Sequence, residues 1–245
     1  MARSISVVVP TLNDDAELQG LLASVDRLDV LEIIVVDASR RPPPPRPGGR
    51  EIVIRASQPG RGRQIAEGAR RASGDLLWIL HADTRPPESA VADIQRILSD
   101  PAVALGCFPL RFDRAHPVLW LSARLSRLDG VGLTFGDQGF FMRHADYEAV
   151  GGAPDWALFE DVELRRRLKT LGRVKKARDP VRTSARRFLS DGPLRRQIGN
   201  AWLLARFLAG ADPDRLAASY RSGRHRPQTR PKRFSASSAM GPPHS

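Results

Sequence analysis

The stretch Ser-Ile-Ser-Val-Val-Val-Pro at residues 4–10 is a short β-branched run that ends in proline. Residues 31–37, Leu-Glu-Ile-Ile-Val-Val-Asp, repeat this form and end in aspartate. Between the two runs, leucine and valine recur at helical spacing over residues 18–25, and Asn13 or Asp14 can cap this helix. A strand, a helix and a second strand in this order predict a parallel sheet.

The later segments continue this α/β pattern. A proline- and glycine-rich loop at residues 42–49 precedes a short strand at 51–54. The remaining predicted elements are a helix at 62–73, a continuous apolar strand at 75–80, a helix at 88–98, a strand at 102–112, an amphipathic segment at 117–128, a loop entering a strand at 135–142, a helix that opens at 159, and a helix at 194–208. We therefore expect a Rossmann-like, mostly parallel sheet flanked by helices, with further helices toward the C-terminus.

The length of 245 residues suits one catalytic-size domain with a short appendage. From about residue 222 the chain holds prolines, serines and basic residues with no apolar period, so we predict a domain at 1–221 and a disordered basic tail at 222–245. The single cysteine, Cys107, excludes an intramolecular disulfide. Because it lies in an apolar run, we expect it to be buried.

No apolar stretch approaches the roughly 18 residues needed to span a bilayer, and the N-terminus lacks a signal-peptide layout. We therefore expect a cytoplasmic protein, with peripheral contact to a membrane left open. The helix at 194–208 carries Trp202 and can either pack in the core or touch a membrane. We expect it to pack in the core.

The formal net charge of +12 attracts anions such as nucleotide phosphates, anionic lipid or nucleic acid. Many of the basic residues are arginine, and we favour a compositional bias over a polyanion-binding module. The buried strands end in acidic residues, which would repel a nucleic acid. We therefore expect no nucleic acid partner, and a non-enzymatic polyanion-binding protein remains a competing hypothesis.

Acidic and polar side chains follow the predicted strands at the edge where open α/β sheets bind ligands. Asp37 ends the strand at 31–37, and His81-Ala82-Asp83 follows the strand at 75–80. Alternation in an extended segment puts His81 and Asp83 on one side, where they can face a divalent cation that bridges two phosphates. The alternative is a turn or capping role for each of these residues.

The segment Gly60-Arg61-Gly62-Arg63-Gln64 lies where a loop enters a helix. Backbone amides at a helix N-terminus with two flanking arginines can hold phosphate, although a solvated basic turn has the same composition. The segment matches neither the Walker nor the dinucleotide-binding pattern, so it gives no support to an ATPase or a hydride-transfer enzyme.

Two further acidic segments are candidates for proton transfer and acceptor binding. Glu160 and Asp161 open a helix, where carboxylates stabilise the positive end of the dipole and where one of them can also act as a general base. Asp137 and Gln138 lie in a glycine-flanked loop beside aromatic residues, as in an acceptor pocket or an ordinary turn.

Taken together, these segments resemble the family 2 inverting glycosyltransferases of the GT-A fold. More narrowly, the chain resembles the small bacterial branch of arsenosugar-biosynthesis-type glycosyltransferases. The matching segments span residues 4 to 221 in order, and they are residues 6–13, 34–37, 60–64, 80–84, 135–139, 160–164 and 183–188.

The resemblance implies a nucleotide-sugar donor, with UDP-sugars favoured, and assigns residues to it. The residues implied to bind the nucleotide are Pro10, Thr11, Asn13, Asp37, Arg61, Arg63 and Gln64. The sequence departs from the family at Ala38-Ser39, where many members have glycine or aspartate before serine.

The resemblance also implies the reaction. Asp161 takes the place of the general base, and Asp83 takes the place of the last aspartate of the Asp-x-Asp motif that binds Mg²⁺ or Mn²⁺. His81 stands where the family has the first aspartate, and we predict it as a second metal ligand. Asp137, Gln138 and Glu160 are predicted to bind the acceptor, an unidentified small molecule or lipid-linked hydroxyl compound.

A nucleotidyltransferase of the same fold is the alternative enzyme class. Such enzymes resemble a pattern with a glycine-rich, basic loop directly after the first strand. Here residues 10–14 contain no glycine, and the sequence therefore favours glycosyl transfer.

Overall fold

The computed structural model describes residues 2–40, 51–56 and 58–224. Its main sheet has seven strands in the order β3-β2-β1-β4-β8-β6-β9, and β8 is antiparallel to both of its neighbours while the other pairs are parallel. The strands are β1 (Ile5–Thr11), β2 (Glu32–Asp37), β3 (Glu51–Arg55), β4 (Leu76–Ile79), β6 (Val103–Cys107), β8 (Phe141–Arg143) and β9 (Arg173–Lys176). The predicted mostly parallel α/β sheet is confirmed.

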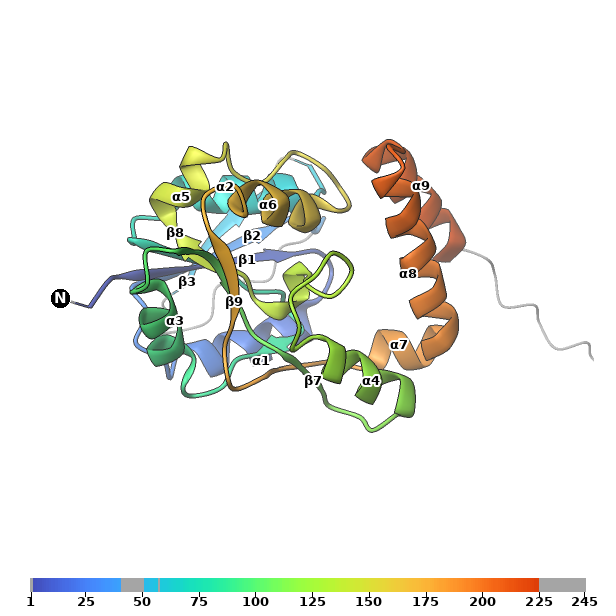
Figure 1. The fold of residues 1–245 in the computed structure, drawn as a ribbon, viewed down its shortest axis with the longest axis horizontal. Coiled ribbons are helices and arrows are strands. Elements are labelled where there is room, and N and C mark those ends of the chain that lie inside the picture. The colour runs from blue at the N-terminus through green and yellow to red at the C-terminus, as the bar shows by residue number, and fades with distance from the viewer. Residues whose placement is uncertain (1, 41–50, 57, 225–245) are drawn as a thin grey trace, which may run out of the picture.

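Helices cover both faces of this sheet (Figure 1). On one face lie α1 (Asp15–Val25) and α3 (Ala90–Leu98), and on the other lie α2 (Arg61–Arg71), α5 (His144–Ala149) and α6 (Glu160–Leu168). Alternate residues of the central strands point to opposite faces, so that each layer of helices has its own apolar core. Cys107 is buried, as predicted.

Helix α1 shows how the local pattern sets the packing. Its apolar residues at 18, 21, 22 and 25 are all buried against the sheet, as the helical spacing predicts. Asp14, one of the two predicted cap residues, is the N-cap of this helix, but its side chain makes no capping hydrogen bond. Its carboxylate accepts a hydrogen bond from Arg186 instead, at 3.2 Å.

The predicted strand at 102–112 is wrong, because it divides into β6 and β7 (Leu110–Phe112) in different sheets. Strand β7 joins β10 (Val181–Thr183) and β5 (Thr84–Arg85) in a three-stranded sheet of order β5-β10-β7. The break has a local cause. Phe108 donates its amide to the carbonyl oxygen of Gln138, and Pro109 has no amide hydrogen to continue the ladder.

The C-terminal part of the described chain is helical and lies at one end of the sheet (Figure 1). It comprises α7 (Arg186–Asp191), α8 (Pro193–Leu208) and α9 (Pro213–Arg224), while α4 (Pro117–Leu125) lies near α7 and the start of α8. The predicted loop at 42–49 lies outside the described residues, as do residues 225–245 of the tail predicted at 222–245. The predicted start of the tail at residue 222 is wrong, because α9 runs to Arg224.

The prediction that α8 packs as a core helix is wrong. Trp202 is 56% exposed, and Leu194 and Ile198 are exposed as well, whereas Leu203 is buried. The helix carries two apolar stripes, and the stripe that contains Leu203 packs against α9 and the start of α6. Within the described residues, no helix combines the length and apolar character needed to cross a bilayer.

Candidate active site

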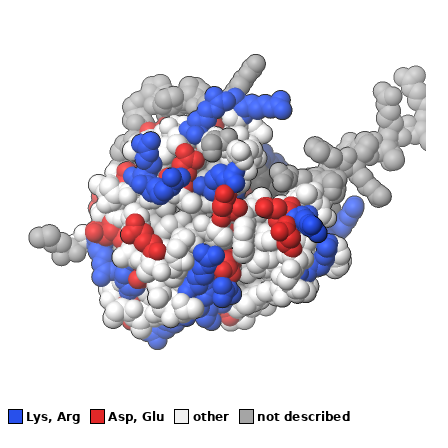
Figure 2. Space-filling view, turned by 90° about the horizontal axis from the view of Figure 1, so that it is seen from above, with Lys and Arg blue, Asp and Glu red and all other residues white. Residues whose placement is uncertain are grey.

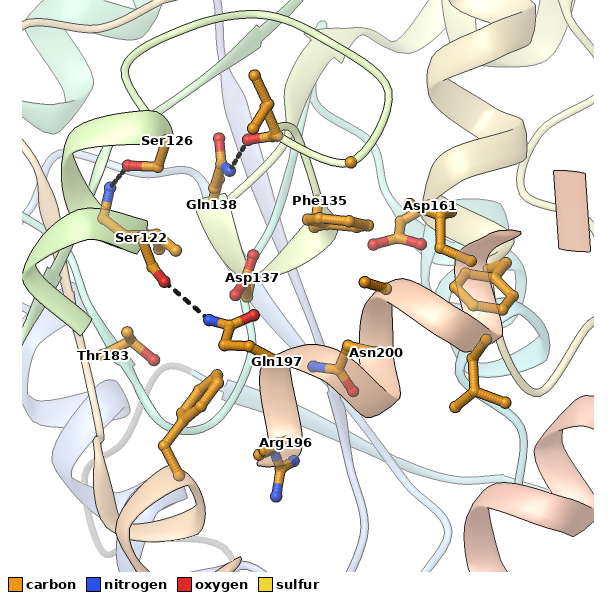
Figure 3. Close-up of a pocket in the computed structure, with 18 of the residues that line it drawn as sticks. Ser122, Ser126, Phe135, Asp137, Gln138, Asp161, Thr183, Arg196, Gln197 and Asn200 are labelled. Atoms are coloured by element: carbon orange, nitrogen blue, oxygen red, sulfur yellow. Dashed lines mark hydrogen bonds between the residues drawn. The ribbon is translucent and has the colours of Figure 1, made fainter. Parts of the chain in front are cut away.

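A cavity of about 530 Å³ lies at the carboxyl edge of the parallel strands, and it extends to α4 and α8 (Figure 3). Five residues singled out from the sequence as charged or metal-binding candidates line it, namely Arg61, His81, Asp83, Asp137 and Asp161. They come from four separate segments: the start of α2, the loop after β4, the turn before β8 and the start of α6. Of the three residues predicted at the carboxyl ends of the strands, His81 and Asp83 line this cavity and Asp37 does not.

Asp161 holds the turn that carries Asp137. Its Oδ2 accepts a 2.6 Å hydrogen bond from the Gly136 amide, and its Oδ1 accepts one of 2.8 Å from the Val162 amide. Gly136 belongs to η1 (Gly136–Gln138), a 3₁₀ turn. The Asp161 carboxylate therefore faces the cavity in a fixed orientation.

Asp137 lies among like charges. Burial, together with the negative charges of Asp161 and Asp83, raises the pKa of its carboxyl group to about 7, while Arg61 opposes the shift. Its Oδ1 is buried and accepts no hydrogen bond from the described residues. These carboxylates form a region of negative potential that favours a bound proton or cation.

Arg61 supplies positive charge next to this acidic group. Its Nε lies 3.3 Å from Oε1 of Glu160, whose side chain is fully buried. Burial and the nearby Asp161 raise the pKa of Glu160 to about 7, although Arg61 acts in the opposite direction. Glu160 in turn raises the pKa of the Arg61 guanidinium, which is therefore charged. Glu160 itself does not line the cavity, whereas its partner Arg61 does.

His81 and Asp83 follow β4 directly and line the cavity together. Among the described residues, no group of three or more His, Cys, Asp or Glu side chains has the arrangement of a metal site. Mg²⁺ commonly takes only one or two protein carboxylates and completes its shell with substrate phosphates and water. Two protein ligands, such as His81 and Asp83, are therefore enough for a metal ion that binds together with a diphosphate.

The nucleotide-binding candidates at the ends of β1 and β2 form a second polar group. Thr11 and Asp37 are partners in the parallel register. Asp37 Oδ1 accepts hydrogen bonds from the amide and the hydroxyl of Ser39, and Ser39 Oγ accepts one from the Asn13 amide. Asp37 Oδ2 and Thr11 Oγ1 are buried and have no hydrogen-bond partner among the described residues. Pro10 lies in β1 beside them.

The start of α2 is engaged with the rest of the protein. Gln64 donates its amide to the carbonyl oxygens of Thr11 and Val36, both at 2.8 Å, and so joins the ends of β1 and β2. Arg63 makes a two-pronged ion pair with Asp155 at 2.8 and 2.7 Å. The Gly62 amide donates to the Trp156 carbonyl oxygen. In this structure that amide is not available to a phosphate.

The amino-acid sequence matches a known protein family. The sequence model described as glycosyl transferase family 2 matches residues 6–151, which is more than half of the chain. The chain belongs to glycosyl transferase family 2. A search of curated proteins found no match.

Solved structures with the fold of this family 2 domain are similar in architecture and distant in sequence. The mannosyltransferase PcManGT from Pyrobaculum calidifontis, in complex with GDP-Man and Mn²⁺, has a TM-score of 0.63 at 15% identity, over 94% of this chain and 77% of that one. S. aureus TarS 1-349 in complex with UDP-GlcNAc has a TM-score of 0.58 at 15% identity, over 74% of this chain and 58% of that one.

Glucosyl-3-phosphoglycerate synthase from Mycobacterium tuberculosis, in complex with phosphoglyceric acid, has a TM-score of 0.51 at 18% identity, over 74% of this chain and 70% of that one. These likenesses show the GT-A-like fold. The family and the fold together support glycosyl transfer from a nucleotide sugar as the activity of this family 2 domain.

The charges on the surface of this family 2 protein are mixed. On the face shown in Figure 2, lysine and arginine side chains are interspersed with aspartate and glutamate. A nucleic-acid-binding face has a continuous basic patch or stripe. The face shown has no such patch.

Sequence reasoning missed several residues that build the site. Lys176 of β9 donates hydrogen bonds to Gln138 Oε1 and to Thr134, while the Gln138 amide donates to the Leu133 carbonyl oxygen, so that Gln138 is held on both sides. From α4 and α8, further polar side chains line the cavity, and they are Ser122, Ser126, Arg196, Gln197 and Asn200 (Figure 3). Polar residues at helical spacing within an otherwise apolar helix were the available signal.

Proposed function

We propose that this protein transfers a sugar from a nucleoside-diphosphate sugar, with a UDP-sugar as the favoured donor, to an acceptor hydroxyl with inversion. We also propose that it belongs to the arsenosugar-biosynthesis-type branch. The observation that carries the reaction is the meeting of Asp161, Asp137, Asp83, His81 and Arg61 in one cavity beside the ends of the parallel strands. This site combines a base, a cation-binding group and a fixed positive charge, which are the parts that the reaction needs.

Asp161 is the proposed general base. Backbone amides already orient both of its oxygens, so the carboxylate is positioned before substrate arrives. It would take the proton of the acceptor hydroxyl while that oxygen attacks the anomeric carbon. Attack from the face opposite to the leaving nucleotide inverts the configuration at that carbon.

Asp83 and His81 are the proposed ligands of a Mg²⁺ or Mn²⁺ ion. The Asp83 carboxylate is the donor that such a cation prefers, His81 would be its second ligand, and the clustered carboxylates around Asp137 give the cation a favourable potential. When bound, the cation would neutralise charge on the departing diphosphate. Arg61, on the same cavity wall, adds a permanent positive charge.

The donor nucleotide is proposed to lie over the ends of β1 and β2, against Pro10, Thr11, Asn13 and Asp37. The buried Asp37 Oδ2 and Thr11 Oγ1 support this placement, since a base or ribose would supply hydrogen-bonding groups for them. Gln64 and Arg63 are proposed to act on the nucleotide indirectly, by fixing the loop around it, because their side chains already bind other groups of the protein.

The acceptor is proposed to occupy the half of the cavity near α4 and α8. Asp137 lines this region with Gln138, and Glu160 acts on it through its ion pair with Arg61. The wall beyond these residues is largely apolar and includes Leu110, Phe112, Leu125, Phe188, Leu204 and Leu208. Such a wall fits an acceptor with an apolar part as well as a small molecule.

A thermal-shift panel tests this proposal. UDP-, GDP- and dTDP-sugars would each be added with and without Mn²⁺, and the unfolding midpoint would be measured. We expect one nucleotide class to raise the midpoint, and to raise it more with the metal, because ligands that bind only the folded state stabilise it. Stabilisation by none of the three would count against the proposal.

A further inference from the structure

Helices α4 and α8 carry several large apolar side chains that are exposed to solvent. Trp120 and Leu121 of α4 are 65% and 53% exposed, and Ile198 and Trp202 of α8 are 61% and 56% exposed. Leu194, Ile198 and Trp202 are spaced by four residues, so they form one stripe along α8. The opposite stripe, which includes Leu203, is already packed against the protein.

The two helices contact each other through a hydrogen bond of 2.8 Å between Gln197 Nε2 and Ser122 Oγ. Leu121 and Ile198 are the direct chain neighbours of this bonded pair. The exposed residues of α4 and α8 therefore extend from a shared junction, and we call them together the α4–α8 face. Its members are Trp120, Leu121, Leu125, Leu194, Ile198, Trp202 and Leu208.

The charges on these helices have a single sign. Helices α4 and α8 contain four arginines and no aspartate or glutamate. Arg124, Arg195 and Arg206 are exposed, and in the described part of the chain none of the three forms an ion pair. Arg124 lies over the Trp120 ring at 5.8 Å, and Arg206 lies over the Trp202 ring at 4.8 Å.

We propose that the α4–α8 face docks this protein on an anionic lipid bilayer. Tryptophan with flanking arginine is enriched at membrane–water interfaces, where the indole lies at the headgroup level and the guanidinium contacts phosphate. Arg124 and Arg206 each lie four residues after the tryptophan of their helix and on the same side of it, so the indole and the guanidinium would reach the headgroup level together. A second copy of the chain fits less well, because pairing two such faces would bring only positive charges together.

This docking would place the acceptor side of the cavity at the bilayer. Leu125 and Leu208 belong to the α4–α8 face and also line the cavity. An acceptor with an apolar chain could then pass from the bilayer into the site. This consequence for the acceptor rests on the proposed function, whereas the docking itself does not.

Vesicle co-sedimentation tests the docking. We expect the protein to bind vesicles of phosphatidylcholine that contain phosphatidylglycerol, and to bind phosphatidylcholine vesicles less. Ile198→Ser with Trp202→Ser should weaken binding by on the order of tenfold or more, because two interfacial side chains are lost. Replacing Arg124, Arg195 and Arg206 by glutamine should weaken binding to the anionic vesicles by about fivefold per arginine.

The matched control is Leu31→Ser with Leu171→Ser, which removes two exposed leucines outside α4 and α8 and should leave vesicle binding unchanged. Circular dichroism and the nucleotide-induced thermal shift would establish that each variant is folded and still binds its donor. The proposal is overturned if the wild-type protein binds neither vesicle, or if the α8 variant binds as well as wild type. A wild-type dimer that the α8 variant converts to monomer would overturn it too, by assigning the face to a second copy.

Discussion

The Asp161 carboxylate accepts a 2.6 Å hydrogen bond from the Gly136 amide, and this single bond joins the start of α6 to the η1 turn. The proposed base is thereby held next to Asp137, which follows Gly136 in the chain. The two acidic groups cannot be moved independently. Substitution of Asp161 should therefore test the chemical role of the carboxylate, whereas substitution of Gly136 should test its position.

Asp161→Asn tests the base. The asparagine retains an oxygen that can accept the Gly136 amide, so we expect the fold to survive while turnover falls by about 10² to 10⁴. Release of nucleoside diphosphate from the preferred donor measures this turnover. Asp179→Asn makes the same chemical change at an exposed carboxylate that accepts a hydrogen bond from Ser89, and it should keep near-normal activity. Full activity in the Asp161 variant would remove this residue from the role.

Gly136→Ala tests the close approach of the Gly136 backbone to the Asp161 side chain. A Cβ at this position would lie 3.2 Å from the Asp161 Cβ, 3.3 Å from its Oδ2 and 3.5 Å from His81 Nε2, so the carboxylate has to shift. We expect turnover to drop by roughly tenfold or more from misplacement of the base. Gly199→Ala in α8 is the control, since a Cβ there meets nothing within 4 Å. It should raise stability by up to about 1 kcal/mol through helix propensity and leave turnover unchanged.

Asp137→Asn tests the buried negative charge through the pH dependence of stability. The folded-state pKa of about 7 lies above the ordinary value of 3.8, so the folded protein binds more protons than the unfolded chain between these limits. Stability is therefore lost as pH rises through this window, and it stays reduced above it. In metal-free buffer, the variant should exceed wild type by roughly 2 kcal/mol at about pH 8 and by little at about pH 4.

Urea unfolding at both pH values measures this difference. Glu160, whose pKa is also raised to about 7, is present in both proteins, so its contribution largely cancels. An equal stability gap at both pH values would show that the ionisation of Asp137 is not its cause.

Much of the fold and part of the site follow from local patterns. The apolar spacing of residues 18–25 identifies the buried face of α1, because helical geometry alone decides which side chains share a face. His81 and Asp83 lie at the site because they follow β4, and parallel strands end at one edge of the sheet. Asp161 follows no parallel strand, since it opens α6, and its place in the cavity depends on how that helix packs.

Other features depend on contacts between distant segments. Pro109 interrupts the run at 102–112, but only the pairing of β7 with β10 shows that the second part of the run belongs to a different sheet. The Ser122–Gln197 bond joins residues 75 positions apart, so no local pattern predicts that α4 and α8 wall the cavity. In α8 both stripes are apolar, and periodicity does not determine which of them finds a partner within the chain.

Asp83→Asn tests the proposed metal site. If Asp83 ligates the cation, the variant should need at least about tenfold more Mn²⁺ for the same thermal shift in the presence of the preferred nucleoside diphosphate, because one charged oxygen ligand is lost. His81→Ala should weaken the metal effect in the same direction, since it removes the second ligand. Asp179→Asn is the matched control, because Asp179 is exposed and its carboxylate accepts a hydrogen bond from Ser89. A Mn²⁺ titration of the unfolding midpoint gives the affinity for each variant. Identical titrations for wild type and Asp83→Asn would show that Asp83 does not ligate the cation, and that it does not stabilise the leaving diphosphate through that cation.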